Sequence, residues 1–185
     1  MDLLLASTSP RRILLMEAMG LEFRSVDPAV NESTIITPDP GTTAMARAEA
    51  KALTVAARHR EAVVVAADTV VALEGEILDR ARDERDVRRM LERLSGKEHQ
   101  VITAVAVCFP GFTDAIVETD VTHVSFRELS DGEIDWYAGT GEGEGKAGGY
   151  AVQGLGGTLI ATMDGDRDTV IGLPVSLVER MLEGY

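Results

Sequence analysis

The sequence predicts a protein of the α/β class, because helical and extended patterns alternate along its length. Residues 62–73 form an almost continuous apolar run, which indicates a buried strand. Residues 99–109 and 115–126 are two long extended stretches joined by Pro110 and Gly111, a pattern typical of a β-hairpin. Buried strands combined with helical segments predict helices packed against a sheet.

The N-terminal third predicts two short strands and two helices. A serine followed by proline is a common helix start, and it occurs at Ser9 and Pro10. Gly20 can end the helix that begins there. The elements expected are a strand at 2–6, a helix at 9–19, a strand at 22–26, a loop at 27–40 and an alanine-rich helix at 42–59.

The rest of the chain predicts three further helices around the hairpin. Ser130 and Glu133 have the spacing of a capping box, which marks a helix start. Residues 139–157 are rich in glycine and predict a loop. The remaining elements expected are a turn at 74–75 leading to 76–78, a helix at 83–94, a helix at 130–138, short strands at 158–163 and 168–171, and a final helix from Pro174 to Leu182.

Length and composition indicate one domain over residues 1–185. The formal net charge of −13 argues against a general surface for nucleic acid or anionic membranes. Cys108 is the only cysteine, which favours a reducing compartment. No apolar run approaches the ~18 residues that span a bilayer, and the N-terminal apolar stretch does not have the form of a signal peptide. We therefore expect a cytoplasmic protein.

The helix start at Ser9 carries two positive charges in its first turn. Arg11 and Arg12 lie where the helix dipole is already positive and backbone N–H groups are free. An anion would stabilise this arrangement, so the segment predicts a phosphate site at a strand-to-helix turn. The alternative is that both arginines lie along a solvated helix face.

Asp68 is the second candidate, because it interrupts the apolar run 62–73. A buried carboxylate is costly unless it has a partner, a metal or hydrogen bonds, so Asp68 is a candidate metal ligand or general base. The alternative is a wet residue at the sheet edge. Glu32 in the polar loop and Lys51 on the alanine-rich helix are further candidates, each of which also suits a solvated surface.

Positive and amide groups near the glycine-rich loop complete the candidate set. Arg80 and Arg82 can reach a phosphate or lie on the surface. Lys146 and Gln153 are the groups of 139–157 that can bind a nucleotide, one by charge and one through its amide. The loop lacks the residue order of a P-loop or a dinucleotide fingerprint.

Taken in order, these segments resemble the Maf family of nucleoside triphosphate pyrophosphatases. The resemblance covers nearly the whole chain. It implies an elongated α/β fold in which a twisted mixed sheet is flanked by helices, with a central cleft between two lobes, as in inosine triphosphatase-like proteins. The segments that carry it are 5–12, Glu32, 51–52, 67–71, 90–96 with His99 and Val101, 146–154, 165–166 and 170–174.

The resemblance also implies an activity, cleavage of a nucleoside triphosphate between its α and β phosphates. Asp68 would activate water, and Glu32 with Asp68 would hold a divalent cation, Mg²⁺ or Mn²⁺. Arg11, Arg12 and Lys51 would grip the triphosphate. Ser7 or Ser9 would contribute a hydroxyl, and a homodimer is implied.

The branch of the family that prefers dTTP and UTP matches best. Arg12, Thr69 and Gln153 would mark selectivity for a uracil or thymine ring. The alternatives are a 7-methyl-GTP or broad-specificity pyrophosphatase and a regulator of septum formation with little catalysis. One departure is Arg80, which stands where the family usually has lysine followed by proline.

Overall fold

A computed structural model describes residues 2–183. The strands are β1 (Leu3–Leu5), β2 (Arg24–Ser25), β3 (Val63–Leu73), β4 (Glu76–Leu78), β5 (Glu98–Cys108), β6 (Ile116–Phe126) and β7 (Ile160–Asp164). The α-helices are α1 (Pro10–Ala18), α2 (Pro40–Ala56), α3 (Glu84–Leu94), α4 (Asp131–Gly139), α5 (Arg167–Ile171) and α6 (Val175–Leu182), and the 3-10 helices are η1 (Glu32–Thr34) and η2 (Leu155–Leu159). None of these helices is long and apolar enough to cross a membrane.

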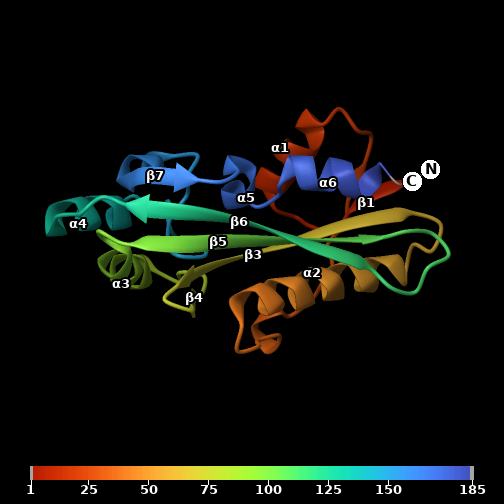
Figure 1. The fold of residues 1–185 in the computed structure, drawn as a ribbon, viewed down its shortest axis with the longest axis horizontal. Coiled ribbons are helices and arrows are strands. Elements are labelled where there is room, and N and C mark those ends of the chain that lie inside the picture. Colours follow the sequence, from red (N-terminus) through yellow and green to blue (C-terminus); the bar gives the residue numbers. More distant parts are fainter. Residues whose placement is uncertain (1, 184–185) are drawn as a thin grey trace.

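The strands of the described chain form one mixed sheet (Figure 1). Its order is β2-β1-β3-β5-β6-β7, and β4 pairs with β3 off this path. Strand β1 is parallel to β2 and β3, whereas β3, β5, β6 and β7 are antiparallel neighbours. The prediction of a twisted mixed sheet flanked by helices is confirmed.

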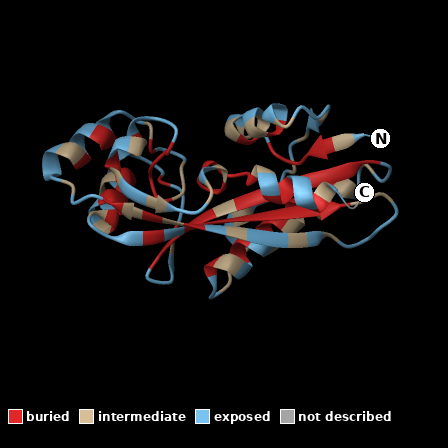
Figure 2. Ribbon diagram, turned by 45° about the horizontal axis from the view of Figure 1, so that its top comes forward, coloured by how far each residue is buried: buried red, intermediate tan, exposed pale blue. Residues whose placement is uncertain are grey.

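The three long strands β3, β5 and β6 connect two lobes. In the first lobe, α2 covers one face of the sheet while α1 and α6 cover the other, and in the second lobe α3, α4 and β7 gather at the far end of the strands (Figure 1). Each side of the sheet in the first lobe has its own buried apolar cluster, and the second lobe has a third. Burial follows the central strands from one lobe to the other (Figure 2).

Helix α2 packs closely on the sheet because its contact face is made of small side chains. Ala44, Ala48 and Ala52 recur every four residues, are fully buried and cluster with Ala66 of β3 and Ala104 of β5. Alanine against alanine brings the helix and strand backbones near each other. Long side chains of this helix, such as Lys51, can therefore contact residues of β3.

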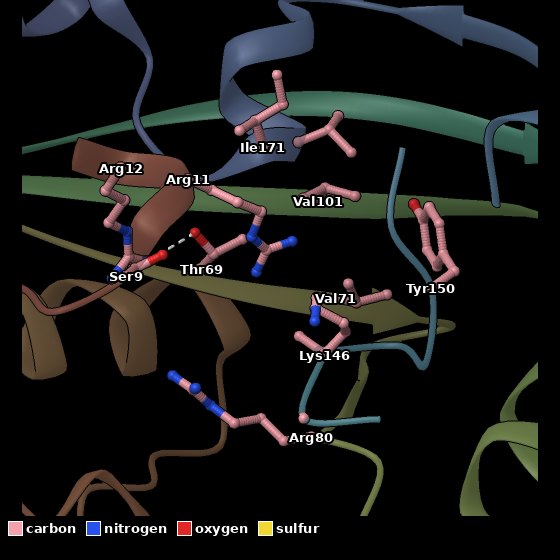
Figure 3. Close-up of a pocket in the computed structure, with 13 residues that line it drawn as sticks. Ser9, Arg11, Arg12, Thr69, Val71, Arg80, Val101, Lys146, Tyr150 and Ile171 are labelled. Atoms are coloured by element: carbon pink, nitrogen blue, oxygen red, sulfur yellow. Dashed lines mark hydrogen bonds between the residues drawn. The ribbon is translucent and has the colours of Figure 1, made fainter. Parts of the chain in front are cut away.

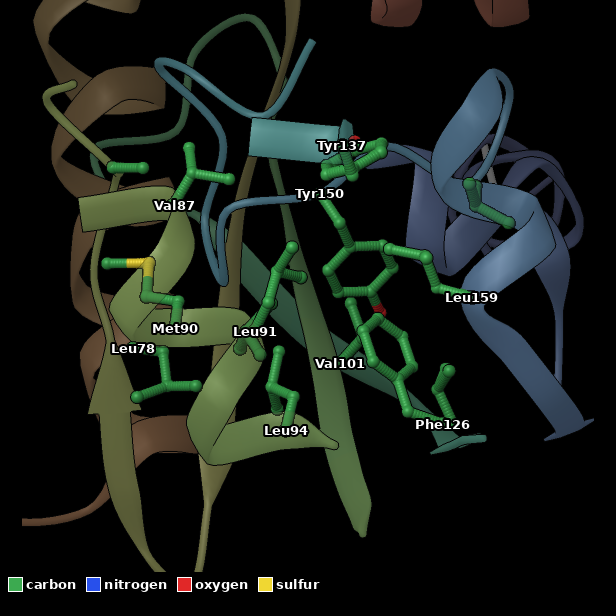
Figure 4. Close-up of a cluster of buried hydrophobic side chains, with 14 of the residues drawn as sticks. Leu78, Val87, Met90, Leu91, Leu94, Val101, Phe126, Tyr137, Tyr150 and Leu159 are labelled. Atoms are coloured by element: carbon green, nitrogen blue, oxygen red, sulfur yellow. The ribbon is translucent and has the colours of Figure 1, made fainter. Parts of the chain in front are cut away.

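Large side chains fill the core of the second lobe (Figure 4). Leu91 and Leu94 of α3 pack toward Phe126 of β6, Tyr137 of α4 and Leu159 of η2, and all five are at most 3% exposed. Burial of such side chains stabilises a fold by about 1.5–3 kcal/mol each. The second lobe is therefore a packed unit that can hold the glycine-rich segment against the sheet.

Most predicted elements are confirmed, and one is wrong. Residues 168–171 were expected to form a strand but belong to α5, because the Asp166 side chain accepts a hydrogen bond from the Asp168 N–H and starts a helical turn. Gly172, with a φ of 122°, ends that turn. The predicted strand at 22–26 shrinks to the two residues of β2. Helix α4 has the predicted capping box.

Candidate active site

A buried ion pair lies at the middle of β3, where the two lobes meet. Asp68 is 1% exposed, and the Lys51 ammonium from α2 lies 2.7 Å from its Oδ1 atom. The Arg47 guanidinium, one helical turn before Lys51, lies 4.0 Å from Oδ2. Asp68 is therefore not a wet residue at the sheet edge, and the cost of its burial is offset by two cations.

Lys51 joins Asp68 to a second carboxylate. Its Nζ atom lies 2.5 Å from Oε1 of Glu32 and also donates to the Ala67 carbonyl at 3.3 Å. An ammonium group has three N–H donors, and these three acceptors account for them. Lys51 in this arrangement bridges two carboxylates and has no donor left for a phosphate, so its predicted grip on a triphosphate stays a prediction.

Arg80 makes the other contact of Glu32. Its guanidinium lies 2.8 Å from Glu32 Oε2, although the Arg80 side chain is 56% exposed. Burial raises the pKa of Glu32, but Lys51, and then Arg80 and Arg12, outweigh it and hold that pKa below its usual value. Arg80 therefore keeps the positive charge of the family lysine while forming a pair with a candidate metal ligand.

One buried oxygen of the cluster is left without a hydrogen bond. Oδ2 of Asp68 has no hydrogen-bond partner among the described residues. Within residues 2–183, no group of three or more His, Cys, Asp or Glu side chains could hold a metal ion by itself. Mg²⁺, however, is commonly held by one or two carboxylates together with substrate phosphates. Glu32 and Asp68 fit that donor set when a nucleotide is bound.

The second part of the site is the N-terminal turn of α1. Ser9 occupies the N-cap position but its side chain makes no capping bond; its N–H donates instead to Oγ of Ser7 at 3.2 Å. Arg12 is 8% exposed and donates from Nε to the Gly172 carbonyl at 2.8 Å. Arg12 is therefore not on a solvated helix face. Burial lowers the pKa of Arg11, and Arg80 lowers it further. Burial also lowers the pKa of Arg12, although the charges of Asp68 and Glu32 partly offset this effect.

These side chains surround a hollow of about 70 Å³ at the junction of the lobes (Figure 3). Ser9, Arg11 and Arg12 come from the first lobe, whereas Lys146 and Tyr150 come from the glycine-rich segment of the second. Thr69, Val71 and Val101 contribute from the long strands, Arg80 from the segment after β4, and Val170 and Ile171 from α5. The predicted central cleft between two lobes is this hollow.

The cations around the hollow differ in whether they have a carboxylate partner. Among residues 2–183, Arg11, Arg12 and Lys146 form no ion pair with a carboxylate, whereas Arg80 pairs with Glu32. Burial, and then the nearby Arg11, lowers the pKa of Lys146. Unpaired positive charge that converges on one hollow, in a chain with a net charge of −13, indicates a site for a polyanion.

The glycine-rich segment is hydrogen-bonded to the segment after β4, which carries Arg80. The Ala81 N–H donates to the Lys146 carbonyl at 3.0 Å, and the Gly145 N–H donates to the Ala81 carbonyl at 2.8 Å. Gly148 has a φ of 69°, and a Cβ added there would lie 2.9 Å from Cγ1 of Val71. Only glycine lets this backbone lie against β3, so Gly148 helps to hold Lys146 at the hollow.

Besides Asp68, Glu32 and Lys51 of the buried cluster, three candidate residues do not line the hollow. Gln153 is exposed and does not line it. Arg82 forms an ion pair with Asp86 at 2.7 Å and, with it, lines a different surface hollow. Ser7 is buried and shapes the turn through Ser9. The prediction that Gln153 marks base selectivity therefore stays a prediction.

Sequence reasoning did not identify Arg47 or Tyr150 as part of the site. Arg47 could have been found, because it lies four residues before Lys51 and so shares its helix face. The Tyr150 hydroxyl lies 2.8 Å from Nε2 of His99, which is 2% exposed. Burial lowers the pKa of His99 to about 4. His99 is thus a buried neutral residue that contacts Tyr150, which lines the hollow.

A two-lobed α/β fold with a hollow lined by cations indicates a protein of the class that binds phosphorylated ligands. Two solved structures share the fold. The Staphylococcus aureus Ham1 protein has a TM-score of 0.57 at 16% identity over 100% of this chain and 99% of that one. A HAM1 protein from Coxiella burnetii has a TM-score of 0.55 at 12% identity, with both chains covered in full.

The sequence profile of Maf-like proteins matches residues 2–185, and the chain belongs to the Maf family. A relative from Thermus thermophilus, named dTTP/UTP pyrophosphatase, is 46% identical over 97% of this chain and 92% of its own length. Relatives with the same name from Deinococcus radiodurans and Aquifex aeolicus are 44% and 42% identical, each over 98% of this chain and over 91% and 94% of their own lengths. The sequence resemblance to this family is confirmed.

Proposed function

We propose that this protein hydrolyses dTTP and UTP between the α and β phosphates, releasing the nucleoside monophosphate and pyrophosphate. The observation that carries the proposal is the set of cations that form no ion pair among the described residues, Arg11, Arg12 and Lys146, which converge on the hollow. A triphosphate supplies the negative charge that this set lacks. The relatives named dTTP/UTP pyrophosphatase give the substrate class.

In the proposed mechanism the protein mainly positions charged and polar side chains around the phosphates and the attacking water. Arg11 and Lys146 bind phosphate oxygens, and the Ser9 hydroxyl, which makes no capping bond, is free to donate to another. Oδ2 of Asp68 accepts a proton from water while the water oxygen bonds to the α-phosphorus and the bond to the β-phosphate oxygen breaks. Lys51 keeps the opposite oxygen of Asp68 in place.

We further propose that Glu32 and Asp68 bind a divalent cation, Mg²⁺ or Mn²⁺, together with the substrate. Such an ion would neutralise charge that develops on the phosphates. Release of Glu32 from Arg80 would free that guanidinium for pyrophosphate, since Arg80 lines the hollow and its side chain is 56% exposed. Binding of the metal and of the nucleotide should therefore depend on each other, which titration calorimetry with and without substrate measures.

The test is a panel assay of purified protein with Mg²⁺ or Mn²⁺. The panel holds dTTP, UTP, CTP, ITP and 7-methyl-GTP, and pyrophosphate and orthophosphate are detected separately. We expect pyrophosphate mainly from dTTP and UTP. Pyrophosphate mainly from 7-methyl-GTP would move the protein to the other branch, orthophosphate alone would contradict cleavage at the α–β bond, and no turnover would favour a regulatory role.

The role of Asp68 is tested by Asp68→Asn, with Asp114→Asn as a control at an exposed loop position. Asparagine keeps the shape but cannot accept the proton from water, so turnover should fall by about 10²–10⁴-fold. Nucleotide binding measured without a divalent cation should remain, because the cations of the hollow are unchanged. Turnover equal to that of the parent would remove Asp68 from this role.

The expected oligomeric state and location of the protein also stand as proposals. We propose a homodimer, tested by light scattering of purified protein, and a cytoplasmic location, tested by fractionation of cells.

A further inference from the structure

A row of polar side chains crosses the sheet next to the hollow. Thr69 of β3 lies directly opposite Thr103 of β5, and Thr103 lies directly opposite Asp120 of β6. Residues that pair in this way project from the same face of a sheet. Thr169 of α5 covers the row: Thr103 donates to its carbonyl at 2.7 Å, and its own hydroxyl donates to Asp120.

The proton positions along this row follow from the partners. A threonine hydroxyl has one hydrogen to donate, and a carbonyl oxygen only accepts. The Thr103 hydrogen is therefore used on the Thr169 carbonyl. In the 2.9 Å contact between the two hydroxyls, Thr69 must then donate and Thr103 must accept.

Thr69 has no second hydrogen to offer. The Arg12 guanidinium donates to its Oγ1 atom at 3.1 Å, which uses one of the two acceptor positions of the hydroxyl. Thr69 lines the hollow, whereas Thr103 is 0% exposed and does not. A ligand therefore meets Thr69 as a hydrogen-bond acceptor, and Thr103 is the residue that makes it one.

We propose that Thr103 is a specificity-determining positioning residue, which fixes the Thr69 hydroxyl as an acceptor so that the hollow selects a ring with an N–H beside a carbonyl. Arg12 has N–H donors left beyond the two that it uses on Gly172 and Thr69. Together the two side chains present a donor next to an acceptor. This proposal rests on the proposed function, because that function supplies the nucleotide.

Uracil and thymine have the matching edge. Their ring atom N3 carries a hydrogen and lies between two carbonyls, whereas N3 of cytosine has a lone pair and no hydrogen. An acceptor opposite N3 therefore bonds to uracil and thymine and faces a second acceptor in cytosine. A buried polar group left unpaired in this way is a strong basis for discrimination between similar substrates.

The test compares Thr103→Val with Thr103→Ser. Valine has the shape of threonine without the hydroxyl, which frees the Thr69 hydrogen to point into the hollow, whereas serine keeps the hydroxyl. We expect Thr103→Val to change the ratio of kcat/KM for UTP to that for CTP by at least tenfold toward CTP, mainly through a higher KM for UTP. We expect Thr103→Ser to keep the parent ratio within about twofold.

Thr169→Val is the matched structural control. It removes the hydrogen bond that the Thr169 side chain of α5 donates to Asp120 of β6, but it leaves the Thr169 carbonyl in place for Thr103. If general loosening of α5 set the ratio, Thr169→Val would change it as much as Thr103→Val. That result, or an unchanged ratio in Thr103→Val, would overturn the proposal.

Two further measurements keep the test decisive. If Thr103→Val does not fold, as judged by its thermal transition, Thr103→Ala removes the same hydroxyl without added bulk and should give the same change of ratio. If the parent protein hydrolyses no nucleotide, the proposed function fails, and calorimetry with UMP and CMP tests Thr103 alone. A parent that binds both equally, or a Thr103→Val variant that keeps the UMP preference, would then refute the inference.

Discussion

Replacement of Lys51 by methionine tests whether the buried bridge holds the site and the fold together. Methionine has a similar length but no charge, so Lys51→Met leaves Asp68 with only the Arg47 guanidinium, 4.0 Å from its Oδ2 atom. Glu32 keeps only its pair with the exposed side chain of Arg80. The variant therefore tests what the ammonium contributes between two carboxylates that lie 2.7 Å and 2.5 Å from it.

The expected loss is large because the lysine is buried. Removal of one partner from a buried ion pair costs about 3–5 kcal/mol of unfolding free energy, since a charge is left without compensation. With a urea dependence of about 2 kcal/mol/M, the unfolding midpoint should fall by roughly 1.5–2.5 M. Equilibrium urea unfolding at pH 7.5, followed by circular dichroism, measures this difference.

Lys97→Met is the matched control. Lys97 also pairs with a carboxylate, Glu74, at 3.1 Å, but its side chain is 46% exposed. Exposed ion pairs contribute about 0–1 kcal/mol, so this variant should stay near the parent. A loss in Lys51→Met that is no larger than the loss in Lys97→Met would refute the argument that the bridge is stabilising.

The same variant has a pH signature. The pKa of Glu32 is lowered from its ordinary value of 4.5, so the stability that Glu32 contributes is present above that value. This contribution is lost as the pH falls through the lower pKa of the folded state. The difference between the parent and Lys51→Met should therefore shrink in acid, and a difference that grew there would contradict this assignment.

Two further predictions concern the walls of the hollow. Gly148→Ala should lower the unfolding free energy measured in urea by about 2–4 kcal/mol, because φ is 69° and the new Cβ would lie 2.9 Å from Val71. The control Gly145→Ala has a similar φ of 71° but no atom within 4 Å of the new Cβ, so it should cost only about 1–2 kcal/mol. Equal losses would show that the contact with Val71 does not contribute. Burial lowers the pKa of His99 from 6.5 to about 4, so the unfolded chain binds a proton that the folded chain does not, and the unfolding free energy should fall by about 3 kcal/mol between pH 6.5 and 4. His99→Gln should flatten that slope, and the same slope in both proteins would show that other groups cause it.

The local elements could be predicted from the sequence because their signals lie within a few residues of one another. The capping box of Ser130 and Glu133 and the N-cap of Asp83 act across three residues, and both helices begin where expected. The apolar run 62–73 indicated a buried strand, and β3 covers Val63–Leu73. Residues 168–171 were assigned wrongly because a short apolar run suits a strand and a buried helical turn equally well.

The sequence also indicated that Asp68 needs a partner, since a carboxylate in an apolar strand is costly. It could not name the partner. Lys51 is 17 residues away, and it reaches Asp68 because the alanine face of α2 packs closely on β3. Nothing local distinguishes Lys51 from a lysine on a solvated helix face.

The sequence by itself therefore determined the α/β class, the family and the residue types of a candidate phosphate site. The tertiary structure decided which of these groups meet. Thr103 illustrates the difference, because its hydroxyl bonds to residues 34 and 66 positions away, and a threonine in a strand is otherwise ordinary. The direction of those hydrogen bonds, and with it the polarity of Thr69 at the hollow, exists only once β3, β5 and α5 have packed together.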